Sequence, residues 1–158
     1  MSATIRAATP ADVGAIHALM YELAEFEKLT HLFTGTAEGL ADALFGTRPA
    51  AEALVAEDAG RIVGYALFFH NYSTFLSRRG LYLEDLYVQP SQRGTGLGTA
   101  MLRALAAIAI ERGCARFEWT VLDWNVDAQK FYRRLGAEVM SSWWTCRVTG
   151  DGLTNLAT

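Results

Sequence analysis

The chain has 158 residues with a formal net charge of −3, and 51% of the residues are hydrophobic while 20% are charged. This length suffices for one domain with a real core, so we expect a single domain over residues 1–158. The composition is that of a globular protein and excludes a mainly disordered chain. An acidic balance argues against nucleic-acid binding, which usually requires a basic surplus, so we expect no nucleic-acid partner.

The first residues and the cysteines bear on the cellular compartment. "MSATIRAATPADVG" lacks the basic cluster and apolar run of a signal peptide, and no window reaches the roughly 18 apolar residues of a membrane span. Cys114 and Cys146 have no CxxC spacing, so we expect buried free thiols. We therefore expect a cytoplasmic protein with no membrane partner and no metal site. The histidines also lack metal-ligand spacing: His17, His31 and His70.

A short strand over residues 4–8 and a first helix open the chain. Thr9 and Pro10 predict the start of this helix, because a hydroxyl caps the free amides and proline needs no amide partner in a first turn. Apolar residues then recur at helical spacing as far as Phe26.

A shorter helix and a hairpin follow. Thr36 is a candidate cap for the helix, and Gly46 is a candidate stop. Residues 53–57 and 62–69 have the pattern of a hairpin, with "DAGR" as its turn. Residues 70–80, "HNYSTFLSRRG", lack a clear period, so we expect a loop there.

The second half alternates strands with helices. We expect strands over residues 81–88, 115–122 and 143–149, with Pro90 stopping the first of them. Residues 96–112 have an apolar helical face and end at Gly113. A second helix is predicted over residues 126–135, capped by Asn125 and stopped by Gly136, and Asp151 is a candidate cap for a final turn. This order predicts a mixed sheet with helices packed on it, an α/β or α+β layer fold.

The segment Arg93-Gly94-Thr95-Gly96-Leu97-Gly98 joins a predicted strand to a predicted helix. The first amides of a helix have no internal partners and carry partial positive charge. Glycines let the backbone curl so that several amides converge on one anion, which favours a pyrophosphate site at the helix N-terminus. A Walker loop would need GKS or GKT, and a dinucleotide fingerprint would need different spacing. A plain glycine-rich turn remains an alternative.

These residues resemble a known family. "QRGTGLG" after "YLEDLYV" is similar to the acetyl-CoA-binding motif R/Q-x-x-G-x-G/A of GNAT N-acetyltransferases, with Arg93, Gly96 and Gly98 at its fixed positions. "GLYLEDLYV", "VLDWN" and "FYRRLGA" resemble the spermidine/spermine (diamine) branch and its thialysine-acetylating relatives. The resemblance covers most of the chain and is strongest from Tyr82 to Ala137.

The resemblance implies the GNAT fold: a mixed, mostly antiparallel central sheet, parallel strands that splay apart at the cofactor cleft, and helices on both faces. It also implies an acetyl-CoA-dependent N-acetyltransferase. The acceptor would be the primary amine of a small cationic molecule, such as a diamine, a polyamine or a lysine analogue like thialysine. Family resemblance further suggests a homodimer, with the late strand near the interface.

In the family, the cofactor lies between two splayed parallel strands, here residues 81–88 and 115–122. By resemblance, Leu86 and Val88 offer backbone groups to the pantetheine arm, and the amide near Leu86 polarises the thioester carbonyl. The amides of residues 94–99 take the pyrophosphate, and Asn125 lies near the cofactor arm, although helix capping is an alternative role for it. The implied cofactor-binding set is Leu86, Tyr87, Val88, Arg93, Gly94, Thr95, Gly96, Leu97, Gly98, Thr99, Asn125 and Ala128.

Acetyl transfer needs an amine without its extra proton, a donor for the oxyanion and an acid for the leaving thiolate. By resemblance, Tyr132 in "KFYRRLG" is the acid; the alternative is a packed aromatic with a hydrated hydroxyl. By resemblance, Glu84 meets the substrate amine and serves as the deprotonation route. A solvated carboxylate on the strand surface is the alternative. Asp85 would face the other side of a regular strand and be structural.

Phe26 and Glu27 align with the substrate-contacting pair of the family. Acidic residues crowd the N-terminal helices and would form either an acidic mouth that concentrates cations or an ordinary solvated face: Glu22, Glu25, Glu27, Glu38 and Asp42. The diamine branch carries acidic residues before the late strand, whereas this chain has "SSWWTC", which puts long polyamines in doubt. A protein N-terminus or lysine as acceptor, and a non-catalytic acyl-CoA-binding protein, are the alternative functions.

Overall fold

The computed structural model describes residues 2–158, which fall into two compact units divided after Thr120. Because each unit is described by itself, the single domain over residues 1–158 stays a prediction. The first unit contains β1 (Thr4–Ala7), α1 (Val13–Phe26), α2 (Ala37–Phe45), β2 (Glu52–Asp58), β3 (Arg61–Ser73), β4 (Arg78–Val88), α3 (Leu97–Glu111) and β5 (Phe117–Glu118). The second unit contains α4 (Val126–Arg134) and α5 (Gly150–Leu156).

The strands of the first unit form one five-stranded mixed sheet in the order β1-β2-β3-β4-β5. Neighbouring strands from β1 to β4 are antiparallel, while β4 and β5 are parallel. The parallel ladder is short: it pairs Leu81 with Phe117 and Tyr82 with Glu118, and it ends there. The mixed, mostly antiparallel sheet confirms the predicted fold class.

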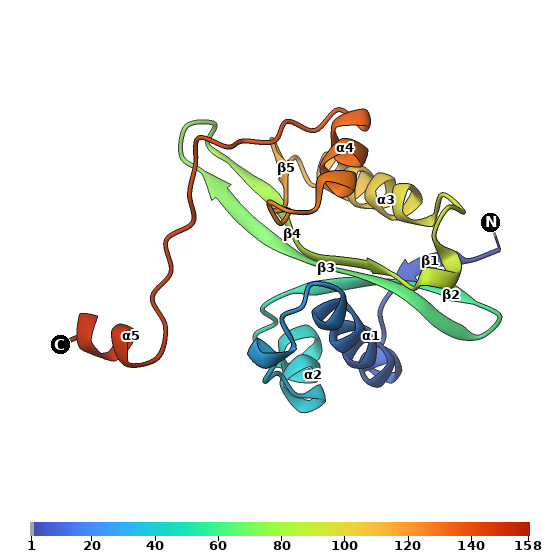
Figure 1. The fold of residues 1–158 in the computed structure, drawn as a ribbon, viewed down its shortest axis with the longest axis horizontal. Helices are drawn as coiled ribbons and strands as arrows, with labels where there is room; N and C mark the ends of the chain where they lie inside the picture. Colours follow the sequence, from blue (N-terminus) through green and yellow to red (C-terminus); the bar gives the residue numbers. More distant parts are fainter. Residues whose placement is uncertain (1) are drawn as a thin grey trace. The chain divides into compact units, whose positions relative to one another are not determined.

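Helices cover both faces of this sheet, as predicted. In Figure 1, α1 and α2 lie on one face of the sheet and α3 lies on the other. The first face is closed by a buried cluster of Val13, Ile16, Leu19, Leu40, Leu44, Ala53, Val55, Tyr65 and Tyr87. On the other face, α3 contacts β4 and buries an apolar stripe at helical spacing: Leu97, Met101, Leu105 and Ala109.

Local signals in the sequence place several boundaries correctly. The β2–β3 turn uses Ala59 and Gly60 with φ of 50° and 76°, the left-handed pair that a tight hairpin requires. Thr36 accepts a hydrogen bond from the amide of Gly39 at the start of α2. The Asn125 side chain does the same for Ala128 at the start of α4. The turn and the two helix caps depend only on residues that are close in the sequence, so the sequence alone predicts them.

The loop expected over residues 70–80 is wrong for most of its length. The β3–β4 ladder continues through Asn71 opposite Gly80, Tyr72 opposite Arg79 and Ser73 opposite Arg78. Residues 74–77 alone connect the two strands. Polar composition indicated a loop, but pairing with a neighbouring strand supplies the backbone hydrogen bonds that residue preference does not.

Two predicted strands also need correction. Of the strand expected over residues 115–122, only Phe117–Glu118 has strand structure, although Ala115 and Arg116 also exchange backbone hydrogen bonds with β4. Residues 143–149 form no strand, and the segment that follows is the helix α5. Aromatic and β-branched residues favour a strand, but the conformation persists only where a neighbouring strand pairs with it.

Candidate active site

The glycine loop has an open backbone at the start of α3. Gly94 and Gly96 have φ of 77° and 87°, which side-chain-bearing residues rarely adopt. Gly96 is the N-cap residue and offers no side chain to the first amides of the helix. A Cβ atom added at Gly94, Gly96 or Gly98 would meet no atom within 4 Å. Because the first amides of α3 lack partners within the helix, this loop fits a diphosphate.

The edge of β4 next to this loop is open as well. Pairing with β5 ends at Tyr82, so within residues 2–120 no strand lies beside Leu83–Val88 on that edge. The Arg93 side chain donates from Nε to the carbonyl of Val88 at 3.3 Å. An open strand edge that leads to a loop with free helix amides fits an extended pantetheine arm followed by a diphosphate. The roles assigned to Leu86 and Val88 stay predictions.

A bulge in β4 decides where its two acidic residues lie. Leu67 pairs with Asp85, but the next residue, Phe68, pairs with Leu83, so Glu84 is the extra residue of the ladder. Glu84 is exposed, whereas Asp85 is partly buried and accepts a hydrogen bond of 2.8 Å from the hydroxyl of Tyr65. Tyr65 is fully buried in the cluster beneath α1 and α2. The bulge thus leaves Glu84 exposed and Asp85 on the α1 side.

Asp85 and Glu27 form an electrostatically coupled pair. Burial raises the pKa of Asp85, and the bond from Tyr65 only partly opposes this. Burial also raises the pKa of Glu27, and the nearby charge of Asp85 raises it further. Burial and Asp85 likewise raise the pKa of Tyr65. Two carboxyl groups that resist ionisation favour a bound cation, because a positive charge would relieve both.

The end of α1 places Phe26 and Glu27 beside β4. Lys28 follows with φ of 61° and turns the chain away from the helix axis. One turn earlier, Glu22 accepts hydrogen bonds from Tyr87 at 3.5 Å and from Gln89 at 3.1 Å. These contacts hold the C-terminal half of α1 against the C-terminal end of β4. The predicted acceptor residues and the open edge of β4 therefore lie in one part of the first unit.

The remaining predicted site residues lie in the second unit. Tyr132 is a half-buried residue of α4, and its ring lies 5.4 Å from that of Phe131. Asn125 caps this helix through Ala128, so its alternative role is confirmed. The proton-donating role of Tyr132 and the cofactor contacts of Asn125 and Ala128 stay predictions.

Comparison with known proteins decides the family. Residues 16–137 match the model of the acetyltransferase (GNAT) family. The chain belongs to the GNAT acetyltransferases. It is an N-acetyltransferase of this family, and GNAT acetyltransferases generally use acetyl-CoA.

Relatives and solved structures similar to this GNAT chain extend over nearly its whole length. The thialysine N-epsilon-acetyltransferase of Mus musculus is 39% identical, covering 99% of this chain and 98% of the mouse protein. The L-ornithine N5-acetyltransferase of Arabidopsis thaliana is 36% identical, covering 97% of this chain and 87% of the plant protein. An integron cassette protein of V. cholerae has a similar structure, with a TM-score of 0.83, 27% identity and coverage of 99% and 98%.

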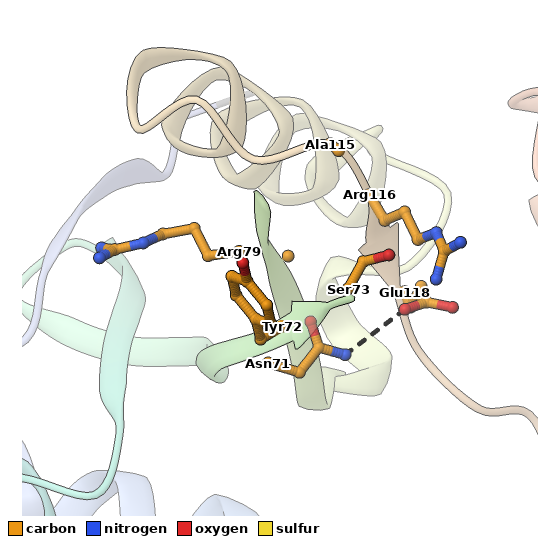
Figure 2. Close-up of a pocket in the computed structure, with 8 residues that line it drawn as sticks. Asn71, Tyr72, Ser73, Arg79, Ala115, Arg116 and Glu118 are labelled. Carbon is orange, nitrogen blue, oxygen red and sulfur yellow. Dashed lines mark hydrogen bonds between the residues drawn. The ribbon is translucent and has the colours of Figure 1, made fainter. Parts of the chain in front are cut away.

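A pocket at the other end of β4 contains none of the predicted site residues. Figure 2 shows it between the ends of β3, β4 and β5, where the Asn71 amide donates to Glu118 at 3.4 Å. Its volume of about 50 Å³ is far too small for coenzyme A.

Within residues 2–158, no cluster of side chains is suited to a metal ion. None of the helices over the same residues is long and apolar enough to cross a membrane.

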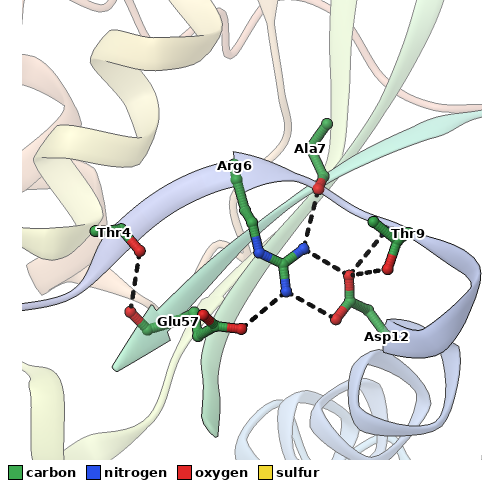
Figure 3. A network of polar contacts seen from close by, with 6 residues as sticks. All are labelled: Thr4, Arg6, Ala7, Thr9, Asp12 and Glu57. Carbon is green, nitrogen blue, oxygen red and sulfur yellow. Dashed lines mark hydrogen bonds and ion pairs between the residues drawn. The ribbon is translucent and has the colours of Figure 1, made fainter. Parts of the chain in front are cut away.

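Asp12 is buried, whereas Asp85 is partly buried, and Asp12 has quite different surroundings (Figure 3). Arg6 donates to both of its carboxylate oxygens, at 2.8 and 3.0 Å, and also reaches Glu57 at 2.9 Å. The amide and hydroxyl of Thr9 donate to it as well. The bond from Arg6 is the main cause that lowers the pKa of Asp12 to about 2. This network fastens β1 and β2 to the start of α1.

Sequence analysis did not single out Tyr65 and took Asp85 as structural. "ED" in β4 indicated that one carboxylate faces each side, but the bulge that decides the sides depends on pairing with β3. No sequence pattern indicated that Gln89 would contact α1. A hydrogen bond from a buried tyrosine of one strand to an acidic residue of the next is visible only once the strand register is known.

Proposed function

We propose that this protein transfers the acetyl group of acetyl-CoA to the primary amine of a small cationic molecule, a diamine or a lysine analogue. The coupled carboxyl groups of Glu27 and Asp85 beside the open edge of β4 carry this proposal. The names of two relatives support it, since ornithine and thialysine are small amino acids with a side-chain amine. Two carboxylates in a partly desolvated site would bind an ammonium group strongly.

The side chains of the first unit would prepare the acceptor. Glu27 and Asp85 hold the ammonium group, and a carboxylate of β4 accepts its extra proton so that the nitrogen can attack. By resemblance this carboxylate is Glu84; Asp85, buried beside Glu27, is the second candidate. When bound, acetyl-CoA supplies an acetyl thioester as the electrophile. Tyr132 would donate its phenolic proton to the sulfur as the carbon–sulfur bond breaks.

A short acceptor fits this chain better than a long polyamine. Residues 141–146 read "SSWWTC" and supply no carboxylate for a distant second ammonium group. The anionic side chains beside β4 belong to the end of α1 and to β4 itself, with Glu22 already bonded to Tyr87 and Gln89. We therefore propose acceptors in which one amine reacts and the remaining charge lies close to it.

A panel of amines with acetyl-CoA tests the proposal, followed by release of free thiol. The panel contains a short diamine, ornithine, thialysine, spermidine and a peptide with a free N-terminus. We expect the short amines to be used at least tenfold better than spermidine or the peptide, as judged by kcat/KM. Preference for the peptide would indicate a protein amine acetyltransferase. Binding of acetyl-CoA without turnover of any amine would indicate a non-catalytic acyl-CoA-binding protein.

Substitution of Tyr132 tests the proton donor separately. Tyr132→Phe removes the acidic hydroxyl and keeps the ring, so kcat should fall about 100-fold, the usual contribution of a general acid. The affinity for acetyl-CoA, measured by calorimetry, should stay within about twofold. An unchanged kcat would exclude the acid role of Tyr132.

We also propose a cytoplasmic homodimer. Apolar side chains of the C-terminal segment support self-association: Trp143 is 76% exposed and Trp144 is 89% exposed. The cytoplasmic location rests on the two free cysteines, Cys114 and Cys146, of which the first is half-buried and the second exposed, so the prediction that both thiols are buried is wrong. Light scattering after size exclusion should give a mass twice that of the chain, and replacing both tryptophans with serine should give the monomer.

A further inference from the structure

We propose that Arg93 is a positioning residue whose side chain connects the end of α1, with Phe26 and Glu27, to the glycine loop of residues 94–99. Binding of coenzyme A at this loop then strengthens binding of the amine beside α1, and the reverse. This inference rests on the proposed function. Sequence analysis assigned Arg93 to the cofactor as part of the glycine motif, and the structure also places its guanidinium group near the rings of Phe26, at the end of α1, and Tyr87, in β4.

The contacts of Arg93 are specific. Its Cζ atom lies 5.1 Å from the ring centroid of Phe26 and 5.8 Å from that of Tyr87. Both distances are within the range of a cation–π interaction. Its Nε atom donates to the carbonyl of Val88 at 3.3 Å. The guanidinium group is therefore held by a helix residue, a strand residue and a backbone acceptor.

The partners of Arg93 belong to the end of α1 and to the C-terminal end of β4. Phe26 ends α1 and is followed directly by Glu27, one of the two acceptor carboxylates. Tyr87 is 6% exposed and its hydroxyl donates to Glu22, also on α1. Arg93 itself precedes Gly94 and Gly96, whose backbone shapes the diphosphate loop. A movement of the loop is thus transmitted to the last turn of α1 through one side chain.

The chemistry of the contact explains why arginine is needed. A guanidinium group is planar and can stack against an aromatic ring while its Nε–H donates in the plane of the group. A lysine ammonium group is a point charge with no such plane, so it would keep the charge and lose the geometry. Replacing the aromatic ring of Phe26 with an aliphatic side chain would remove the same contact between Arg93 and α1.

The contacts of Arg93 predict that the binding free energies of coenzyme A and of the amine are coupled. Filling the loop with a diphosphate would restrict Arg93, and Arg93 would hold Phe26 and Glu27 in the position that binds the amine. By linkage, the amine would strengthen coenzyme A binding by the same factor.

Calorimetry with unacetylated coenzyme A and the best amine of the panel measures this factor without turnover. In the unaltered protein, coenzyme A should tighten amine binding about 5- to 10-fold, a typical size for coupling between sites. In Arg93→Lys and Phe26→Leu, the factor should fall below about twofold, while the affinity for coenzyme A alone changes less than about threefold. Arg103→Lys, on the exposed face of α3, is the matched control and should keep the full factor.

Steady-state kinetics gives a second readout. Both variants should raise the KM for the amine several-fold at saturating acetyl-CoA and leave kcat within about twofold, because they disturb binding and not the chemical step. Coupling that persists in both variants would overturn the inference. A large loss of coenzyme A affinity with intact coupling would make Arg93 a phosphate ligand and overturn it too. If the unaltered protein binds neither ligand, the proposed function fails and the inference fails with it.

Discussion

Asp12 and Asp85 are two aspartates of the same unit with opposite electrostatics. Asp12 receives two bonds from Arg6 and two from Thr9, and the bond from Arg6 is the main reason why its pKa is low. Asp85 receives a bond from the neutral hydroxyl of Tyr65, and burial raises its pKa. The first carboxylate stabilises the fold. The second is costly to ionise in the fold and therefore suits a site that a cation occupies.

The contrast extends to the residues around each aspartate. Arg6 satisfies the charge of Asp12 within the protein and also pairs with Glu57, which leaves Asp12 little to offer a ligand. Glu27 adds a second negative charge near Asp85, so this pair gains from an external cation. We propose that a structural carboxylate and a ligand-binding one differ in whether the chain supplies the positive partner. The following predictions test this distinction, beginning with the largest effect.

Asp85→Asn should reduce kcat/KM for the amine about 100-fold. The change keeps the size of the side chain and an acceptor for Tyr65, but it removes the charge that holds the ammonium group. Thiol release at varied amine concentration measures the effect, and calorimetry should give an acetyl-CoA affinity within about twofold of normal. Asp151→Asn, an exposed aspartate of α5, is the control. Equal activity in the Asp85 and Asp151 variants would contradict a functional role for Asp85.

Asp12→Asn should lower the free energy of unfolding by about 2 kcal/mol at pH 7, which corresponds to roughly a 30-fold change in the unfolding constant. The folded pKa of about 2 lies below the ordinary value of 3.8, so this contribution is present above pH 3.8. It should vanish as the pH falls from 3.8 to 2. Urea denaturation at several pH values measures it. A loss that is equally large at pH 2 would mean that the ion pair is not its source.

Amine use should depend on pH in the range set by Glu27 and Asp85. The pKa values of Glu27 and Asp85 are raised above 4.5 and 3.8, and both groups must be ionised to hold the ammonium, so kcat/KM should fall about tenfold per unit below the higher pKa and about a hundredfold per unit below both. Tyr65→Phe removes the bond that lowers the pKa of Asp85, so the acid limb should move to higher pH. An acid limb at or below pH 4.5 in the unaltered protein would argue against the pair.

The same Asp85→Asn variant should be more stable than the unaltered protein. A carboxylate whose pKa is raised by folding costs stability above that pKa, and the neutral amide avoids this cost. We expect Tm to rise by roughly 2–4 °C at pH 7, the shift that about 1 kcal/mol gives in a domain of this size. The effect should shrink at acidic pH, where Asp85 is protonated. A lower Tm at pH 7 would indicate that Asp85 stabilises the fold, as Asp12 does.

Sequence alone predicted the parts of this protein that depend on neighbouring residues. The left-handed turn at Ala59 and Gly60 and the cap of Asn125 need only a few adjacent backbone groups. The glycine loop belongs with them, because Gly94 and Gly96 require backbone angles that side chains oppose, whatever packs around them.

The tertiary structure decided everything that depends on partners distant in sequence. Pairing with β4 made a strand of residues 70–73, and residues 143–149 have no strand structure despite a favourable pattern. The bulge at Glu84 appears only in the register between β3 and β4, in which Asp85 accepts a hydrogen bond from Tyr65. Hydrogen bonds and charges act over a few ångströms in space and not along the chain, so the partners of Asp85 and Arg93 follow from packing.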